Sequence, residues 1–325
     1  MLTPAGSDSA GEHPVLRVLR ERAAAGSRPG SRTDEHHVVL SIEGGGNRGI
    51  ISGGMALVLD ERMLLPAFDA VYGSSSGALT SAWLLSAGLS TGMRAWADPA
   101  SFAAYSRLSN PLRRRPLIDL EWLIGEFYDR TLRLDSEHVL GNPVSFHPLA
   151  TEVTTGRAVD LHPFIHDKSS LHRALRASAS LPIVAGRPVE IAGNRYLDAG
   201  LVEAVPLDTP IAAGATHILV LGSRREDEMA LDPAWVRRLT SAWLRRSAPG
   251  ARTAFLARNE RAGVIGARLA RHNAEYAMRP AILTIRPAAG APSVGRLESV
   301  AATMREGLAA GRQALQVALT SLAGP

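Results

Sequence analysis

The feature that most constrains the fold is a short apolar strand that turns sharply into an apolar helix, at residues 69–79. Its centre, Gly73-Ser74-Ser75-Ser76-Gly77, fits the pattern G-x-S-x-G of a nucleophile elbow. Gly73 and Gly77 flank Ser75 because such a sharp turn leaves no room for a Cβ atom. The pattern predicts that Ser75 lies at the end of a sheet and at a helix N-terminus, where the helix dipole favours developing negative charge.

A second glycine-rich turn precedes the elbow, between an expected buried strand at residues 36–42 and an expected helix at residues 50–63. The turn reads Gly44-Gly45-Gly46-Asn47-Arg48-Gly49. Glycines here let the backbone pass close to a ligand and point N–H groups at it. The lysine and the Ser/Thr of a P-loop are missing, which argues against a phosphate-binding loop of that kind.

The spacing of Gly44, Gly46 and Gly49 matches a dinucleotide fingerprint, but no acidic residue ends the next strand, which leads into the elbow instead. An oxyanion hole fits the loop better, with the amides of Gly45 and Gly46 as donors to a carbonyl oxygen that becomes negative. We interpret Arg48 as a buttress of this loop through backbone carbonyls, in preference to a contact with an anionic head group.

A third motif, Asp198-Ala199-Gly200, ends a pair of short strands expected at residues 187–191 and 195–197. A serine hydroxyl is a poor nucleophile until a base accepts its proton, and none of the ten histidines follows the elbow in a motif-like setting. A carboxylate can replace histidine if desolvation raises its pKa and it lies within about 2.6–3.2 Å of the hydroxyl. We therefore predict Ser75 as nucleophile and Asp198 as general base.

The composition excludes several other classes of chemistry. The 325 residues contain no cysteine, so disulfides, thiolate catalysis and cysteine zinc sites are impossible. His162 and His166 have the spacing of helical zinc ligands, but Pro163 lies between them and no third ligand is apparent, so we expect no metal or cofactor. The net charge of +5 comes almost wholly from arginine, and the few aromatic residues are not interleaved with it, which argues against a nucleic-acid partner.

The chain is expected to form a mobile tail over residues 1–35 and one domain over residues 36–325. The motifs lie within residues 38–222, and further helices and a last strand are expected within residues 232–322. No apolar run is long enough to span a membrane and no secretory signal is apparent, so we expect a cytoplasmic protein.

Several local elements are also expected. Residues 90–115 are predicted to be irregular and to cap the site, with Arg113-Arg114-Arg115 as a solvated face. Residues 117–128 have the pattern of an amphipathic helix, and a hairpin is predicted around Thr154-Thr155-Gly156. Ser169 or Ser170, Asp232 and Ser293 are predicted helix caps; the last of these helices has an apolar stripe at Leu297, Val300, Met304, Leu308, Leu315, Leu319 and Leu322.

Taken in order, the glycine loop, the elbow, the small residues Ser178 to Pro182 and the Asp198 motif resemble the patatin-like phospholipase family. The resemblance implies a three-layer α/β/α fold with a mostly parallel sheet, a Ser–Asp dyad, and ester hydrolysis without metal or histidine. The family usually has glycine after the aspartate, whereas this chain has Ala199. Alanine makes a left-handed backbone costly, so the carboxylate of Asp198 is expected to sit slightly differently.

The leading hypothesis is thus a serine acyl hydrolase that acts on lipid or other carboxylic esters. One alternative is an acyltransferase with the same dyad and an acceptor other than water, which sequence cannot separate from a hydrolase. A second is a catalytically idle lipid-binding or regulatory module. The arginines of residues 233–276 are best explained as a solvated surface, with peripheral contact to an anionic membrane as the functional alternative.

Overall fold

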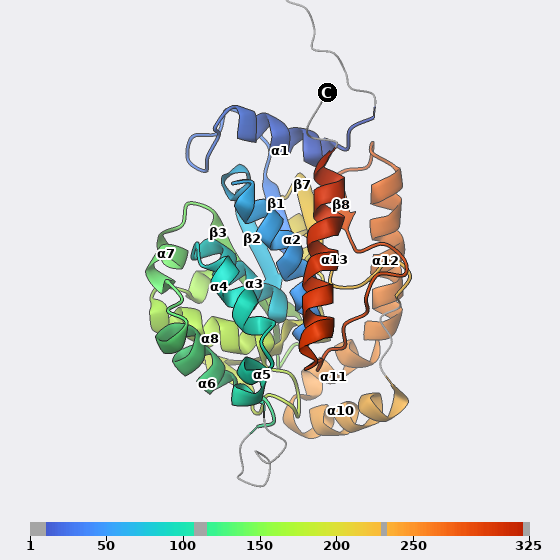
Figure 1. Cartoon of the computed structure of the whole chain (residues 1–325). Helices are drawn as coiled ribbons and strands as arrows, with labels where there is room; N and C mark the ends of the chain where they lie inside the picture. The colour runs from blue at the N-terminus through green and yellow to red at the C-terminus, as the bar shows by residue number, and fades with distance from the viewer. Residues whose placement is uncertain (1–10, 107–115, 229–232, 321–325) are drawn as a thin grey trace, which may run out of the picture.

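The computed structural model describes residues 11–106, 116–228 and 233–320, which form a twisted sheet between two layers of helices (Figure 1). The strand order is β5-β6-β3-β2-β1-β7-β8, and β4 pairs with β3 off this path. The strands are β1 (Val38–Ile42), β2 (Ala70–Ser74), β3 (Ser145–Glu152), β4 (Ala158–Asp160), β5 (Val189–Ile191), β6 (Asn194–Asp198), β7 (His217–Leu221) and β8 (Ala281–Ile285). The strands β3, β2, β1, β7 and β8 are mutually parallel, whereas β4, β5 and β6 add antiparallel pairings at one edge.

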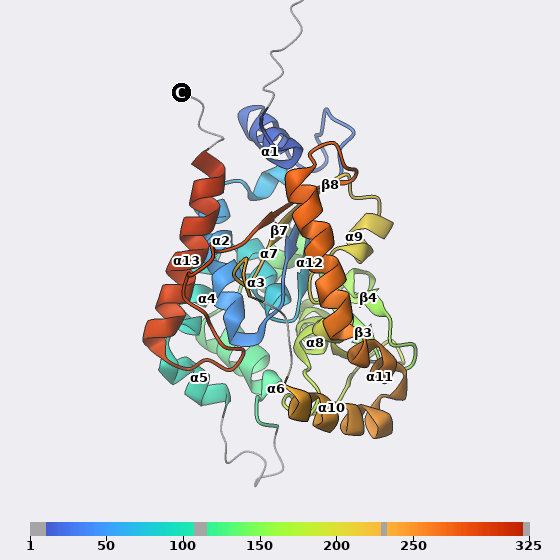
Figure 2. The ribbon, with the colours of Figure 1, turned by 90° about the vertical axis from the view of Figure 1, so that its right-hand side faces the viewer.

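The sheet is covered on both faces because its central strands are apolar on both (Figure 2). In β1, Val38 and Leu40 face the larger core, which contains α2 (Ile50–Glu61), α3 (Ser76–Leu85) and α13 (Ala301–Thr320). The alternate residue Val39 belongs to a second core on the other face. Residues of α9 (Asp208–Ala212) and α12 (Arg258–Ala274) pack against that core. The expected three-layer α/β/α fold is confirmed.

The remaining helices surround this sandwich. They are α1 (Pro14–Ala24), α4 (Leu89–Trp96), α5 (Pro99–Tyr105), α6 (Leu120–Trp122), α7 (Ser136–Gly141), α8 (Lys168–Ala179), α10 (Ala234–Ser247) and α11 (Pro249–Leu256). A π-helix, η4 (Leu123–Thr131), follows α6, and short 3₁₀ turns are η1 (Gly46–Gly49), η2 (Leu65–Ala67), η5 (His162–Phe164) and η6 (Ala199–Leu201). No helix in the described ranges is both long and apolar enough to cross a membrane.

The strand register brings two distant segments together. Ser74, the last residue of β2, is level with Leu149 of the parallel strand β3. The next residue of β3, Ala150, is level with Asp198 of the antiparallel strand β6. Ser75 and Asp198, which are 123 positions apart, are therefore brought to the same level on either side of β3.

The expected mobile tail is wrong for residues 11–35. Helix α1 buries Val15 and Leu19 in the main core and contacts β7 and β8. Arg22, at 2% exposure, forms ion pairs with Asp34 at 2.7 Å and with Asp69 at 2.8 Å, so the segment is joined to the sheet. Residues 1–10 lie outside the described residues.

Several local predictions also need correction. Residues 89–105 form α4 and α5 instead of an irregular cap, and Arg113-Arg114-Arg115 lie outside the described residues. The amphipathic pattern at residues 117–128 corresponds to α6 and the π-helix η4. Asp167, not Ser169 or Ser170, caps α8, although Ser170 completes the capping box. The hairpin of β3 and β4 is confirmed.

The closing part of the chain differs as well. α13 begins at Ala301, so Leu297 and Val300 precede it and are 52% and 56% exposed. Met304, Leu315 and Leu319 are buried as expected, and Leu308 packs against the core. Pro233 occupies the cap position of α10; Asp232 and Leu322 lie outside the described residues.

Candidate active site

Ser75 lies at the apex of a strained turn between β2 and α3. Its backbone has φ 55° and ψ −122°, a conformation that costs a residue with a side chain of order 1–3 kcal/mol. The flanking glycines are required by contact distances. A Cβ at Gly73 would lie 2.6 Å from Ala78 Cα, and one at Gly77 would lie 2.1 Å from the Ile42 carbonyl oxygen. The turn has the geometry expected of a nucleophile elbow.

The Ser75 hydroxyl donates a hydrogen bond of 2.6 Å to Oδ2 of Asp198. The other carboxylate oxygen, Oδ1, accepts the Gly200 N–H at 2.7 Å. Asp198 is 2% exposed, and this burial raises the pKa of its carboxyl above the ordinary value of 3.8. The bonds from Ser75 and Gly200, and the charges of Arg258 and Arg296, oppose that rise.

Three further residues hold the pair in place, and the sequence analysis assigned them no role in the site. Ser178 Oγ accepts the Ser75 N–H at 3.0 Å, and the Ser180 carbonyl accepts the Asp198 N–H at 3.0 Å. Thr151 donates its hydroxyl hydrogen bond to the Asp198 carbonyl at 2.9 Å. The end of α8 and the residue after it thus contact both Ser75 and Asp198. The run of small residues at 178–180 was the feature of the sequence that could have indicated these contacts.

Ala199 does not strain the Asp198 turn. Its backbone is in the 3₁₀ turn η6 and is absent from the described residues with positive φ, so the expected left-handed conformation is not present. The Ala199 side chain is fully buried in the second core. Gly200 is the tighter position, because a Cβ there would lie 2.8 Å from Asp198 Oδ1. The departure from the family pattern therefore leaves the carboxylate where Ser75 can reach it.

The glycine loop runs directly against the elbow. A Cβ at Gly44 would lie 2.5 Å from the Ser74 carbonyl oxygen and 3.1 Å from Ser75 Cβ. A Cβ at Gly49 would lie 2.5 Å from Ser76 Oγ. Only glycine allows this approach of the loop to the elbow, whereas the sequence predicted a close approach to a ligand.

The prediction of oxyanion donors needs a correction at Gly45. The Gly45 N–H donates to Ser76 Oγ at 2.9 Å, and the Gly44 N–H donates to the Ala204 carbonyl at 2.9 Å. The Asn47 N–H donates to the Arg296 carbonyl at 2.9 Å. Within the described residues, the amides of Gly46 and Ser76 have no acceptor outside their own helical turns. These two N–H groups are available to a ligand oxygen.

Buried charges fix the loop to β7. Glu43 is fully buried, accepts the Ser223 N–H at 2.7 Å and pairs with Arg224. Arg48 Nε donates a long hydrogen bond of 3.4 Å to Ser223 Oγ, which in turn donates to the Gly44 carbonyl at 3.2 Å. Arg48 therefore supports the loop through Ser223, not through backbone carbonyls as predicted. Burial lowers the pKa of Arg48 to about 10, and nearby Arg224 adds to this.

A second set of serine, histidine and aspartate lies elsewhere on the sheet. His147 contacts Asp160 at 2.6 Å and Ser145 Oγ at 2.9 Å, and it stacks on Tyr72. Ser145, however, lies in the extended strand β3, and both its N–H and its hydroxyl donate to the Asp69 carbonyl. The set has no elbow and no helix N-terminus. No histidine takes part in the hydrogen bonds of Ser75 or Asp198 in the described chain.

The two histidines with the spacing of helical zinc ligands make other contacts. His162 Nδ1 contacts the Phe146 carbonyl at 2.8 Å, and the His166 N–H donates to Ser170 Oγ. No group of three or more potential metal ligands occurs among the described residues.

Comparison with known proteins places these features in a family. A family model described as patatin-like phospholipase matches residues 40–211, a span that includes the glycine loop, the elbow and Asp198. The uncharacterized protein YjjU of Escherichia coli K12 is 30% identical over 222 residues, which are 64% of this chain and 57% of that protein. The chain thus spans little more than half the length of this relative. The family match covers more than half of the chain, which therefore belongs to the patatin-like phospholipase family of lipid ester hydrolases.

Proposed function

We propose that the protein is a serine acyl hydrolase in which Ser75 attacks the carbonyl carbon of a lipid or other carboxylic ester. Asp198 accepts the serine proton. The observation that carries this proposal is the 2.6 Å hydrogen bond between the two buried side chains. Because burial raises its pKa, the Asp198 carboxylate is a stronger proton acceptor than an exposed aspartate.

The attack produces a tetrahedral oxyanion, for which we propose the amides of Gly46 and Ser76 as hydrogen-bond donors. The oxyanion collapses, the alcohol takes the proton from Asp198, and Ser75 remains acylated. Asp198 then deprotonates a water molecule, which attacks the acyl carbonyl carbon. The bond between this carbon and Ser75 Oγ breaks, Ser75 takes the proton back from Asp198, and the carboxylic acid is released. Loss of one oxyanion donor in such a site costs on the order of 10²–10³ in rate.

The first test is covalent labelling of the purified protein with a fluorophosphonate probe, together with hydrolysis of a panel of esters of varied acyl length. We expect labelling and turnover in the wild type, neither in Ser75→Ala, and loss of turnover in Asp198→Asn. Product analysis with added alcohol distinguishes release to water from transfer to another acceptor.

His147→Gln is the matched control, because it disrupts the only other serine–histidine–aspartate set described above. We expect this variant to keep both labelling and turnover. Activity that survives in Ser75→Ala and disappears in His147→Gln would instead assign the chemistry to Ser145.

We further propose that the protein works at the surface of an anionic membrane, held there by α10. Arg238, Arg245 and Arg246 on this helix are exposed, and the helix contains no acidic residue. Trp235 and Leu239, one turn apart, are 66% and 58% exposed. Exposed apolar and arginine side chains on one helix are typical of peripheral lipid contact.

A further inference from the structure

A turn at residues 295–298, between β8 and α13, lies against the glycine loop from a distant part of the sequence. A Cβ at Gly46 would lie 2.5 Å from the Arg296 carbonyl oxygen. The Glu298 N–H donates to the Gly295 carbonyl at 3.3 Å, which closes the turn, and Val294 just before it is buried in the main core. The turn lies outside residues 40–211, the span that the family model matches.

Asn47 joins this turn to the glycine loop and to α4. Its N–H donates to the Arg296 carbonyl at 2.9 Å, and its side-chain Nδ2 donates to the Glu298 carbonyl at 2.7 Å. Its Oδ1 accepts the indole N–H of Trp96 at 3.2 Å. Because an indole N–H only donates and a peptide carbonyl only accepts, the two ends of the amide cannot be exchanged. The Asn47 side chain, in a residue 7% exposed, is therefore held in one orientation.

These bonds fix the peptide units on both sides of the Gly46 N–H, one of the two proposed oxyanion donors. The preceding amide, that of Gly45, donates to Ser76 Oγ at 2.9 Å, and the following amide is that of Asn47. Gly46 itself has φ 59°, and glycine has more conformational freedom to lose than any other residue. The direction of its N–H therefore depends on the neighbours that hold the loop.

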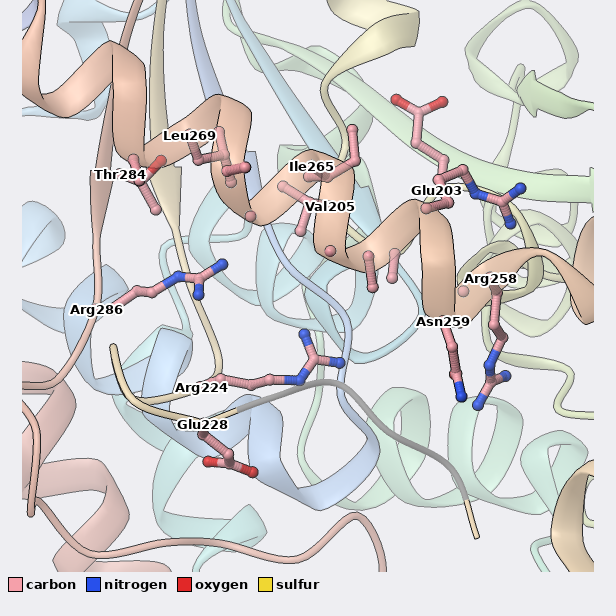
Figure 3. Close-up of a pocket in the computed structure, with 18 of the residues that line it drawn as sticks. Glu203, Val205, Arg224, Glu228, Arg258, Asn259, Ile265, Leu269, Thr284 and Arg286 are labelled. Atoms are coloured by element: carbon pink, nitrogen blue, oxygen red, sulfur yellow. The ribbon is translucent and has the colours of Figure 1, made fainter. Parts of the chain in front are cut away.

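The same turn also reaches the pocket beside the dyad. This pocket has a volume of about 540 Å³ and lies between α12 and residues 224–228 (Figure 3). Arg296 lines it together with Gly200, whose N–H binds Asp198. The positive charge of Arg296 opposes the rise in the pKa of the Asp198 carboxyl. The turn thus acts on the loop through its carbonyls and on Asp198 through its charge.

We propose that Asn47 is a positioning residue of the oxyanion hole: it ties the glycine loop to the turn at 295–298 and so aims the Gly46 N–H at the developing oxyanion. The inference rests on the proposed hydrolase function, to which it adds a residue that acts through the backbone without touching substrate. Oxyanion donors are effective because they are oriented before the reaction, and a displacement of about 1 Å can cost about 10² in rate.

The first test measures kcat/KM for nitrophenyl hexanoate. Asn47→Ala removes both side-chain hydrogen bonds and should lower it at least about tenfold. Trp96→Phe keeps a ring at this position and removes only the donor to Asn47, so it should lower kcat/KM about two- to tenfold. This second variant keeps the proposal testable if Asn47→Ala does not fold.

Asn142→Ala is the matched control. Asn142 also donates its side-chain amide to a carbonyl, that of Leu85, and accepts a backbone N–H, that of Val144, both at 3.0 Å. It precedes β3, whereas the dyad lies level with the other end of this strand. We expect Asn142→Ala to lose stability but to keep the wild-type kcat/KM.

A second measurement separates positioning from a general loss of structure. Trifluoromethyl pentyl ketone forms an adduct in which Ser75 Oγ bonds to the ketone carbon, the serine proton passes to Asp198, and the carbonyl oxygen becomes an oxyanion. Trifluoromethyl pentyl carbinol has the same skeleton but no carbonyl group. Asn47→Ala should raise the inhibition constant of the ketone at least about tenfold and leave that of the carbinol within about twofold.

The possible outcomes distinguish this inference from the hydrolase proposal. Ser75-dependent hydrolysis with the same ketone-to-carbinol ratio of inhibition constants in Asn47→Ala, Asn142→Ala and wild type would overturn the positioning role alone. A loss of affinity for both inhibitors in Asn47→Ala would show a structural role and overturn it as well. Hydrolysis that persists in Ser75→Ala would overturn the hydrolase proposal, and this inference with it.

Discussion

At the scale of single residues, the proposed mechanism depends on one buried carboxylate, Asp198, in the role that a histidine has in many serine hydrolases. Asp198 is desolvated, which raises its pKa, but it keeps a hydrogen bond at each oxygen. Burying an ionised carboxylate costs stability, and the charges of Arg258 and Arg296 offset part of that cost. The burial that makes the Asp198 carboxylate a stronger base therefore also lowers the stability of the folded protein.

The first residue-scale prediction concerns pH. Asp198 must be ionised to accept the Ser75 proton, so kcat/KM for a neutral ester should fall as pH is lowered through a pKa above the ordinary 3.8. A pH–rate profile measures this, with Asp160→Asn as a control that should leave the inflection in place. An inflection that moves in Asp160→Asn or vanishes in His147→Gln would contradict the assignment.

The same pKa shift predicts the stability of Asp198→Asn. Because folding raises the pKa of Asp198, the folded state holds this proton more tightly than the unfolded chain, and stability is lost as pH rises from the unfolded to the folded value. Asparagine does not ionise, so the variant should gain free energy of unfolding relative to wild type over that range. It should also lose about 10²–10⁴ in kcat/KM. Urea unfolding at several pH values measures this difference in stability. An Asp198→Asn variant that is inactive and less stable than the wild type at every pH would indicate a structural role for Asp198 instead.

The sequence was sufficient to find the two residues that the structure brings together and that the proposed mechanism uses. Ser75 and Asp198 stand in short motifs, and the glycines around them have contact distances that exclude any side chain. The donor Gly45 was misassigned because its amide is satisfied by Ser76, a contact that depends on the relative position of two turns. Ser178 was missed as a positioning residue for a similar reason, since its bond to Ser75 spans 103 positions.

At the scale of elements, hydrophobic patterns identified the strands better than the helices. The strands β1, β7 and β8 are continuous apolar runs because helices cover both faces of the sheet. The sequence allowed a short helix at residues 15–25 but placed it in a mobile tail, because residues rich in Gly, Ser, Pro and charge surround it. Its packing depends on Arg22, whose ion pairs with Asp34 and Asp69 are long-range and invisible in a local pattern.

The contact between α2 and α13 explains why the apolar stripe of the last helix was only partly right. A Cβ at Gly311 would lie 1.9 Å from the Ile51 carbonyl oxygen, and one at Gly54 would lie 2.2 Å from the Leu308 carbonyl oxygen. The backbones of the two helices therefore meet at glycines, and a hydrophobicity pattern gives no weight to such positions.

Gly311→Ala should accordingly destabilise the protein by about 1–3 kcal/mol, because the two helices must move apart to admit the methyl group. The matched control is Gly266→Ala in α12, where a Cβ meets nothing within 4 Å. There the change should stabilise by about 0.5–1 kcal/mol, since alanine favours a helix interior. Urea unfolding measures both, and equal effects of the two substitutions would contradict the close helix contact.

At the scale of the whole molecule, the chemistry and the exposed surface of α10 lie towards the same end. α1 packs near the N-terminal ends of the parallel strands, and α10 lies at the opposite end in both views (Figures 1 and 2). The glycine loop and Ser75 follow the C-terminal ends of β1 and β2, and α11, which packs on α10, contacts η6 beside Asp198. A membrane under α10 would therefore face the end that bears the dyad.

Removal of the two exposed apolar side chains of α10 tests this orientation. The double variant Trp235→Ala, Leu239→Ala should bind vesicles containing anionic lipid at least about tenfold more weakly, because each large apolar side chain contributes about 1.5–3 kcal/mol when it leaves water. Hydrolysis of a short-chain monomeric ester should be unchanged, since neither residue lies in the proposed site.

Val317→Ala is the control: it removes a side chain that is 65% exposed on α13. Because the arginines of α10 add attraction to anionic lipid, wild-type binding should also weaken with salt and on purely zwitterionic vesicles. Equal vesicle binding by the double variant and by Val317→Ala would show that the membrane, if bound at all, meets another face of the molecule.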